Sequence, residues 1–226
     1  MNWQDEGYLL SKRKFRENAN IINVFTNSFG KVSGIVYGGT SRKIKNYLQI
    51  SNKIFFFYNS KNENRIGYFK TELVEPISPK YFNDKKKTTA LLSLTSILNI
   101  LLPESQPYKN IYKSLGNLIN NFYDKEWIVF YIKWELNLIK DLGFDPNLHE
   151  FNKNELKNDE IIDLKIDGVI YKVPCFLIAN TKPENITNLM LKKGLNFTRS
   201  VMLNKFFLPN NLIFPKSRIL LENYFD

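Results

Sequence analysis

Cysteine and histidine are almost absent from this chain. Its 226 residues contain one cysteine, Cys175, and one histidine, His149. A single cysteine cannot form an internal disulfide, and these two residues fall short of the four soft ligands of a structural zinc site. The sequence therefore predicts no metal and no cofactor, and it indicates a reducing compartment.

Long hydrophobic runs are also missing. The longest apolar run, residues 90–102, is too short to span a bilayer and contains polar residues such as Ser93 and Asn99. Residues 1–6 have neither the basic start nor the apolar core of a signal peptide. We expect a soluble, cytoplasmic protein with no membrane partner.

Recognisable catalytic motifs are lacking as well. The chain has no phosphate-binding glycine loop, no nucleophile elbow, and no pair of acids beside a histidine. Gly38 and Gly39 precede Thr40 and Ser41, but no following Lys-Ser/Thr pair supports phosphate binding, so a tight turn is expected. A metal-dependent nuclease would need clustered acids, and the nearest group is Asp159, Glu160 and Asp163, which is expected to be a solvated segment. The sequence predicts a protein that is not an enzyme.

Positive charge is what the chain does have. It contains 32 Lys or Arg against 22 Asp or Glu, a net charge of +10, and its hydrophobic content of 43% excludes disorder. This balance favours a polyanionic partner, either nucleic acid or an anionic membrane surface. Abundant Lys, Asn and Ile would also follow from a compositional bias of the coding sequence. The distribution is more informative, because residues 1–80 carry 13 basic against 6 acidic side chains.

The same N-terminal third has the pattern of a small barrel. Alternating apolar residues and turn residues predict five strands, at 7–15, 19–26, 31–37, 54–59 and 65–74. Gly34 predicts a bulge or a sharp coil within the third strand. Five short strands joined by one longer basic connection favour an OB or SH3-like barrel.

Basic and aromatic residues are interleaved in this region, as in surfaces that bind single-stranded nucleic acid. The predicted DNA-binding cations are Lys12, Arg13, Lys14, Arg16, Lys31, Arg42, Lys43 and Lys45, and the aromatic residues that could stack on bases are Phe15, Tyr37 and Tyr47. Two alternatives remain open. The aromatic rings could fill the barrel core instead, and the charges could form an ordinary solvated face.

After Pro76 and Pro79 the hydrophobic period changes, so we place a domain boundary there. Residues 1–79 form the predicted barrel domain, and residues 80–226 form a mostly helical domain, which makes the fold α+β with more than one domain. Helices are expected at 88–102, 108–122, 124–146, 184–193, 197–208 and 216–225. Asp167 and Gly168 predict a small β-hairpin insertion over 161–173.

The helix expected within 124–146 is the most strongly bounded element. Asp124 can cap its start, Gly143 can take the left-handed position after its end, and Pro146 blocks continuation. Its predicted core residues are Trp127, Trp134, Glu135 and Gly143. A carboxylate on the apolar side needs a partner, and we expect Glu135 to pair with Arg199, Arg218 or a helix N-terminus.

Several segments, in this order along the chain, resemble one known family. They are Asp5–Leu10, Phe25-Thr26, Gly30, Gly34, Val36–Gly39, Leu48-Gln49, Leu102–Glu104, Pro107, Tyr112, Trp134–Leu136, Leu142–Phe144, Gly194–Asn204 and Leu212–Arg218. The family is RecO, the bacterial recombination mediators of DNA repair, and the closing segments resemble its alphaproteobacterial members.

The resemblance implies an N-terminal OB-fold, a C-terminal helical domain, and binding of single- and double-stranded DNA. It also implies annealing of complementary strands, contacts with RecR and with the tail of the single-stranded-DNA-binding protein, help in loading RecA, and a place at the nucleoid. Two departures stand out. Many members carry a four-cysteine zinc site that this chain lacks, and Ile50 replaces a proline common in the family. An OB-fold RNA-binding or translation-associated module is the alternative function.

Overall fold

The computed structural model describes residues 2–39, 41–60, 66–148, 161–178 and 186–226. These fall into two compact units. Unit 1 comprises Met1–Tyr112 with Pro215–Arg218, and unit 2 comprises Lys113–Phe214 with Ile219–Asp226.

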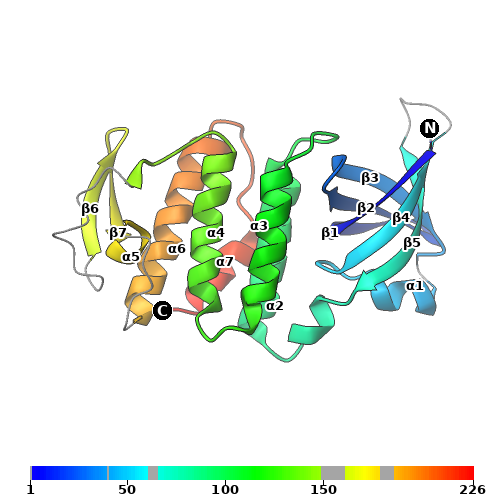
Figure 1. Cartoon of the computed structure of the whole chain (residues 1–226), viewed down its shortest axis with the longest axis horizontal. Helices are drawn as coiled ribbons and strands as arrows, with labels where there is room; N and C mark the ends of the chain where they lie inside the picture. The colour runs from blue at the N-terminus through cyan, green and yellow to red at the C-terminus, as the bar shows by residue number, and fades with distance from the viewer. Residues whose placement is uncertain (1, 40, 61–65, 149–160, 179–185) are drawn as a thin grey trace. The chain divides into compact units, whose positions relative to one another are not determined.

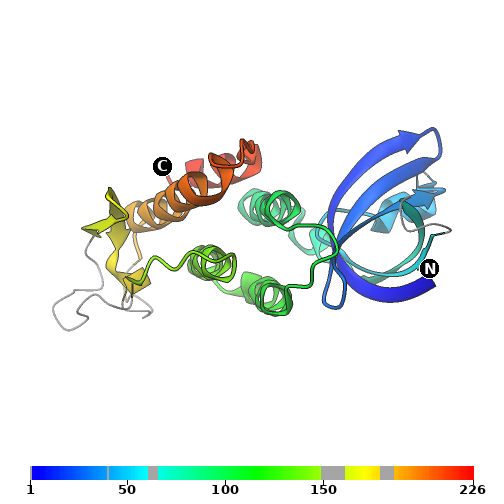
Figure 2. The same ribbon diagram turned by 90° about the horizontal axis from the view of Figure 1, so that it is seen from above.

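Unit 1 is built around a closed barrel of five strands, drawn in blue to cyan in Figure 1. The strands are β1 (Asn2–Arg16), β2 (Ala19–Thr26), β3 (Gly30–Tyr37), β4 (Lys53–Asn59) and β5 (Gly67–Glu75). The barrel order is β1-β2-β3-β5-β4, with β1 also paired to β4. The ring of strands is visible in Figure 2. All five predicted strands are therefore confirmed.

The barrel closes where β3 meets β5, the single parallel pairing in the barrel, at Gly34↔Gly67 and Ile35↔Tyr68. A Cβ on Gly34 would lie 2.5 Å from the ring of Phe69, so the glycine lets that ring pack against the strand. Of the two features predicted at Gly34, a bulge or a sharp coil, the bulge is wrong, because β2 and β3 stay in register there. The register shifts lie in β1 instead, between Leu9 and Ser11 and again near its end, and between Lys53 and Ile54 where β4 pairs with β5.

The barrel interior is filled by aliphatic and aromatic side chains. The buried cluster consists of Leu9, Ile22, Val24, Val32, Val36, Leu48, Ile54, Phe56 and Phe69. Ile22 and Val24 of β2, and Val32 and Val36 of β3, lie at even spacings and so share the inward face of their strands. The basic connection after β3 contains a short helix, α1 (Arg42–Tyr47), that the sequence did not predict.

The barrel continues through a 3₁₀ turn, η1 (Ser78–Tyr81), into α2 (Lys85–Leu101). The side chain of Asp84 accepts a hydrogen bond from the Lys87 N–H at 3.0 Å and caps this helix. Next along the chain is α3 (Lys109–Asn120), whose first turn belongs to unit 1. There Tyr112 lies against Tyr8 and Phe25 on the outer side of the barrel. Burial raises the pKa of Tyr8 to about 12, with Glu75 and Glu6 adding to the effect.

Unit 2 is mostly helical. A 3₁₀ turn, η2 (Asn121–Tyr123), leads to α4 (Trp127–Asp141), and α4 packs against α6 (Asn188–Met202), as Figure 1 shows. The other described helices are α5 (Cys175–Ile178), the π-helical turn η5 (Leu203–Phe207) and α7 (Lys216–Asn223). The first residues of α7 lie in unit 1.

The bounded helix is confirmed as α4. Its end has the predicted geometry, because Gly143 has φ +102° and the Phe144 N–H donates to the Ile139 carbonyl at 3.1 Å. At the other end the helix begins at Trp127, and the Asp124 side chain accepts from the Glu126 N–H rather than capping the first turn. Trp127 and Trp134 are buried, as expected, but the prediction of Gly143 as a core residue is wrong, because it is exposed at the turn that ends the helix.

The hairpin is also confirmed, as β6 (Ile161–Ile166) and β7 (Val169–Pro174) around Asp167 and Gly168, both with positive φ. The expected break between two helices near 194 is wrong, because α6 runs through Gly194. A Cβ on Gly194 would lie 3.2 Å from Ile132 of α4, so this glycine serves close helix packing. The expected start at 184 lies outside the described residues.

Candidate nucleic-acid interface

The outer face of β1, β2 and β3 carries one of the two groups of candidate side chains. Strand register places Ser11, Asn23 and Ser33 in one row across these strands, and Arg13, Ile21 and Ile35 in the next. Arg13 is exposed. This face of unit 1 therefore presents a cation beside polar groups.

Lys12 lies on the opposite side of β1, because side chains alternate along a strand. Its Nζ donates to the Leu48 carbonyl at 2.7 Å. Burial lowers the pKa of Lys12, and the nearby charge of Lys45 lowers it further. Lys14 shares this side and is exposed. The run of cations in β1 is thus divided between two sides of the strand.

The tip of the β1–β2 hairpin is exposed and basic. Phe15 and Arg16 are both exposed, and the Arg16 guanidinium lies 5.2 Å from the centroid of the Phe15 ring. Tyr37, at the end of β3, is 57% exposed. Phe15 and Tyr37 therefore have ring surface available for a base.

The second basic group belongs to α1. Arg42, Lys43 and Lys45 are exposed on this short helix. Tyr47 of the same helix turns inward, where its hydroxyl donates to the Thr71 carbonyl at 2.6 Å and its ring packs on the barrel core. This arrangement matches the alternative in which the aromatic ring fills the core, so we leave Tyr47 out of the interface.

Lys31 is only 8% exposed. Its Nζ donates to the Asn99 carbonyl at the end of α2, at 2.8 Å. Burial lowers the pKa of Lys31, and the charge of Glu104 partly opposes this effect. Its ammonium is used inside unit 1, so we leave Lys31 out of the exposed interface.

The segment 99–107 was not expected beside the barrel surface. It lies along β2 and β3, where the Ser105 N–H donates to the Lys31 carbonyl at 2.8 Å and the Asn23 amide donates to Asn99 at 2.7 Å. Glu104 accepts from Ser33 at 2.7 Å. The sequence does not reveal this position, because residues 99–107 are distant from β2 and β3 along the chain and lack the alternation of a strand.

Together with the barrel, this segment borders a cleft of about 970 Å³ within unit 1. Aromatic and polar residues both line the cleft, and every lining residue belongs to unit 1. The lining includes Trp3, Arg13, Asn23, Phe29, Ser33, Tyr58, Asn99 and Glu104.

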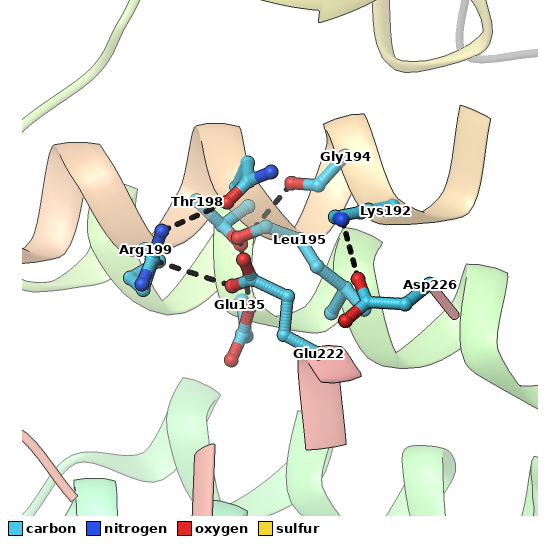
Figure 3. Close-up of polar contacts among 9 residues, drawn as sticks. Glu135, Lys192, Gly194, Leu195, Thr198, Arg199, Glu222 and Asp226 are labelled. Atoms are coloured by element: carbon cyan, nitrogen blue, oxygen red, sulfur yellow. Dashed lines mark hydrogen bonds and ion pairs between the residues drawn. The ribbon is translucent and has the colours of Figure 1, made fainter. Parts of the chain in front are cut away.

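Glu135 in unit 2 is fully buried and does have a partner (Figure 3). The Thr198 hydroxyl of α6 donates to its carboxylate at 2.5 Å. The sequence prediction did not name this residue. The neighbouring Arg199 instead forms an ion pair with Glu222, with 3.2 Å between Nε and Oε2 (Figure 3).

No group of three or more His, Cys, Asp or Glu side chains within the described ranges could hold a metal ion. Cys175 is buried, while His149, Asp159 and Glu160 lie outside the described residues. Asp163 pairs with Lys172 at 3.1 Å. Among the helices in those same ranges, none combines the length and the apolar character that crossing a bilayer requires.

The closed barrel in which β1 pairs with both β2 and β4 and β3 pairs with β5 defines the class of protein: an OB-fold followed by a helical region. Two family models match the chain. Recombination protein O N terminal covers residues 1–77, and Recombination protein O C terminal covers residues 83–161. The chain belongs to the RecO family of DNA repair proteins.

Named relatives agree. The DNA repair protein RecO of Roseobacter denitrificans is 35% identical over 145 residues, which is 64% of this chain and 60% of that protein. The chain therefore matches about three fifths of that relative's length. The RecO of Wolbachia sp. subsp. Drosophila simulans is 29% identical over 240 residues, covering 98% of this chain and 99% of that protein.

Among solved structures, the asparaginyl-tRNA synthetase of Entamoeba histolytica aligns with a TM-score of 0.29 and 10% identity, over 95% of this chain and 60% of that one. A likeness this weak carries no argument.

Proposed function

We propose that this protein binds single- and double-stranded DNA through unit 1, anneals complementary strands, and helps load RecA onto DNA coated with single-stranded-DNA-binding protein. The observation that carries the proposal is the exposed basic surface of the OB barrel. Its members are Arg13, Lys14, Arg16, Arg42, Lys43 and Lys45. Membership in the RecO family supports the same proposal.

Binding by such a surface rests on phosphate contacts. Lys and Arg that neutralise phosphates release condensed counterions, so the affinity falls steeply as salt rises. Phe15 and Tyr37 add exposed rings on which bases of a single strand can stack. Neither the phosphate contacts nor the stacking depends on the DNA sequence. A protein that acts on any damaged region needs such sequence-independent binding.

Annealing then needs no covalent chemistry. The exposed cations form two groups, Arg13, Lys14 and Arg16 on β1 and Arg42, Lys43 and Lys45 on α1. Such a surface can hold two strands at once, raise their local concentration and screen their repulsion. Pairing is accelerated without a nucleophile or a metal.

The proposal includes partners. RecR and the acidic tail of the single-stranded-DNA-binding protein would contact the protein, with RecA acting downstream, and the protein would work in the cytoplasm at the nucleoid. An acidic peptide would be recognised by an apolar pocket bordered by Lys or Arg. We also propose that the protein is not an enzyme.

The test measures the anisotropy of a labelled single-stranded oligonucleotide across a salt series. Arg13, Arg16, Arg42 and Lys43 are replaced together by alanine. The slope of log affinity against log salt should become shallower by about 3, because each lost phosphate contact removes roughly 0.7 from the slope. All four side chains are exposed, so the fold should survive the change.

The matched control removes four exposed lysines of unit 2, at positions 125, 140, 165 and 172, and so changes the net charge equally. It should keep the wild-type slope. Equal slopes for the unit 1 variant and the wild type would contradict the proposed surface. Tighter binding of structured RNA than of single-stranded DNA would favour the RNA-binding alternative.

A further inference from the structure

We propose that the cleft of unit 1 binds one nucleobase of a single strand and prefers a base that carries an exocyclic amino group. This inference rests on the proposed DNA binding and deepens it. The cleft measures about 970 Å³, which is at the upper end of the usual range for small-molecule sites and leaves room for a nucleotide.

One side of the cleft is aromatic. The rings of Trp3 and Phe29 are stacked with centroids 3.9 Å apart, and the Tyr58 ring lies 4.9 Å from Trp3 on a tilted plane. All three residues line the cleft and remain partly exposed. They therefore form a fixed aromatic cluster at the cleft, and its exposed ring surface can receive a base, as aromatic side chains do in single-strand binding.

The polar residues that line the cleft are held in place. The Ser105 N–H bonds the Lys31 carbonyl, and the Ser33 hydroxyl donates to the neighbouring Glu104 carboxylate at 2.7 Å. Glu104 is itself exposed to the cleft. A carboxylate accepts several hydrogen bonds and donates none, so after binding Ser33 it still selects a ligand group that donates.

Arg13 supplies the third component. It lines the same cleft and is exposed on the outer face of β1, where it can contact a phosphate. An aromatic stack, a fixed acceptor and a cation together match a nucleotide. An acidic peptide would be repelled by Glu104, and a basic peptide would be repelled by Arg13.

The chemistry predicts a difference between cytosine and uracil. At position 4 of the ring, cytosine presents an amino group that can donate to Glu104, whereas uracil presents a carbonyl oxygen that the carboxylate repels. The two bases otherwise have nearly the same shape. We expect about fivefold tighter binding of the cytosine strand, which corresponds to one added hydrogen bond.

The experiment compares short oligothymidines that carry a single central deoxycytidine or deoxyuridine, measured by anisotropy at one salt concentration. The wild type should show the fivefold preference. Glu104→Gln should abolish the preference for cytosine, because an amide presents both a donor and an acceptor. The slope of log affinity against log salt should stay unchanged. Glu72→Gln, an exposed position on β5, is the matched control and should keep the preference.

A second measurement locates the base. An oligonucleotide with 5-iododeoxycytidine at the central position should photocrosslink to Phe29 or Tyr58, as mapped by mass spectrometry. Crosslinks confined to residues outside the cleft would overturn the proposal. Salt-dependent binding with equal affinities for the two strands would overturn the base site alone, whereas no binding of any oligonucleotide would overturn the proposed function and the base site together.

Discussion

Gly30→Ala is expected to destabilise unit 1 by about 3 kcal/mol. Gly30 has φ +70°, where an L side chain is strained by about 1 kcal/mol. A Cβ there would also lie 2.0 Å from the Gln106 carbonyl oxygen, so the 99–107 segment would have to move. Relieving a collision with backbone adds roughly 1–3 kcal/mol.

Urea denaturation measures this loss, and hydrogen exchange locates it. The Ser105 N–H, which bonds the Lys31 carbonyl, should lose protection in Gly30→Ala. Gly38→Ala is the matched control, because Gly38 also has φ +70° but a Cβ there would meet only a side-chain atom of Ile44 at 3.6 Å. The control should cost about 1 kcal/mol. Equal losses in the two variants would contradict the proposed collision.

Glu135→Ala is expected to cost unit 2 about 3 kcal/mol or more. Its carboxylate is fully buried and accepts from the Thr198 hydroxyl across the contact of α4 with α6. Removing the side chain opens a cavity and takes away the acceptor of this hydrogen bond, which leaves Thr198 the carbonyls of Gly194 and Leu195 at 3.3 and 3.2 Å. The loss should appear as a lower midpoint of urea unfolding. The unfolding of unit 2 is monitored by tryptophan fluorescence, to which Trp127 and Trp134 contribute.

Glu135→Gln separates the two causes, since the amide fills the same volume and still accepts from Thr198. It should cost less than Glu135→Ala. Asp141→Ala removes an exposed carboxylate from the same helix and should change stability by less than about 0.5 kcal/mol. A loss in Glu135→Ala as small as that in Asp141→Ala would show that the buried carboxylate adds nothing to stability.

Local signals explain what the sequence predicted well. The barrel strands follow from the alternation of residues such as Ile22 and Val24, and the hairpin follows from Asp167 and Gly168, whose backbone takes positive φ. The end of α4 follows from Gly143, because only a residue tolerant of the left-handed conformation can close a helix in this way. Each of these features is set by a few neighbouring residues.

The features that the sequence did not reveal depend on distant contacts. The sequence predicts a bulge or sharp coil at Gly34 and places Gly194 between two predicted helices, but both glycines allow close packing, with Phe69 and Ile132. Lys31 was predicted as a surface cation, and its burial depends on the carbonyl of a residue 68 positions away. Charge and spacing along the chain contain no information about such partners.

The pairing of residues 99–107 with β3 also determines where a fragment that contains the barrel can end. Both family models and hydrophobic period place a boundary near residue 80, yet Phe25 on the barrel is fully buried and lies against Tyr112. A polypeptide truncated at that boundary would expose this apolar face and lose one side of the cleft. A fragment that keeps this face covered must therefore extend past residue 80 and include the first turn of α3.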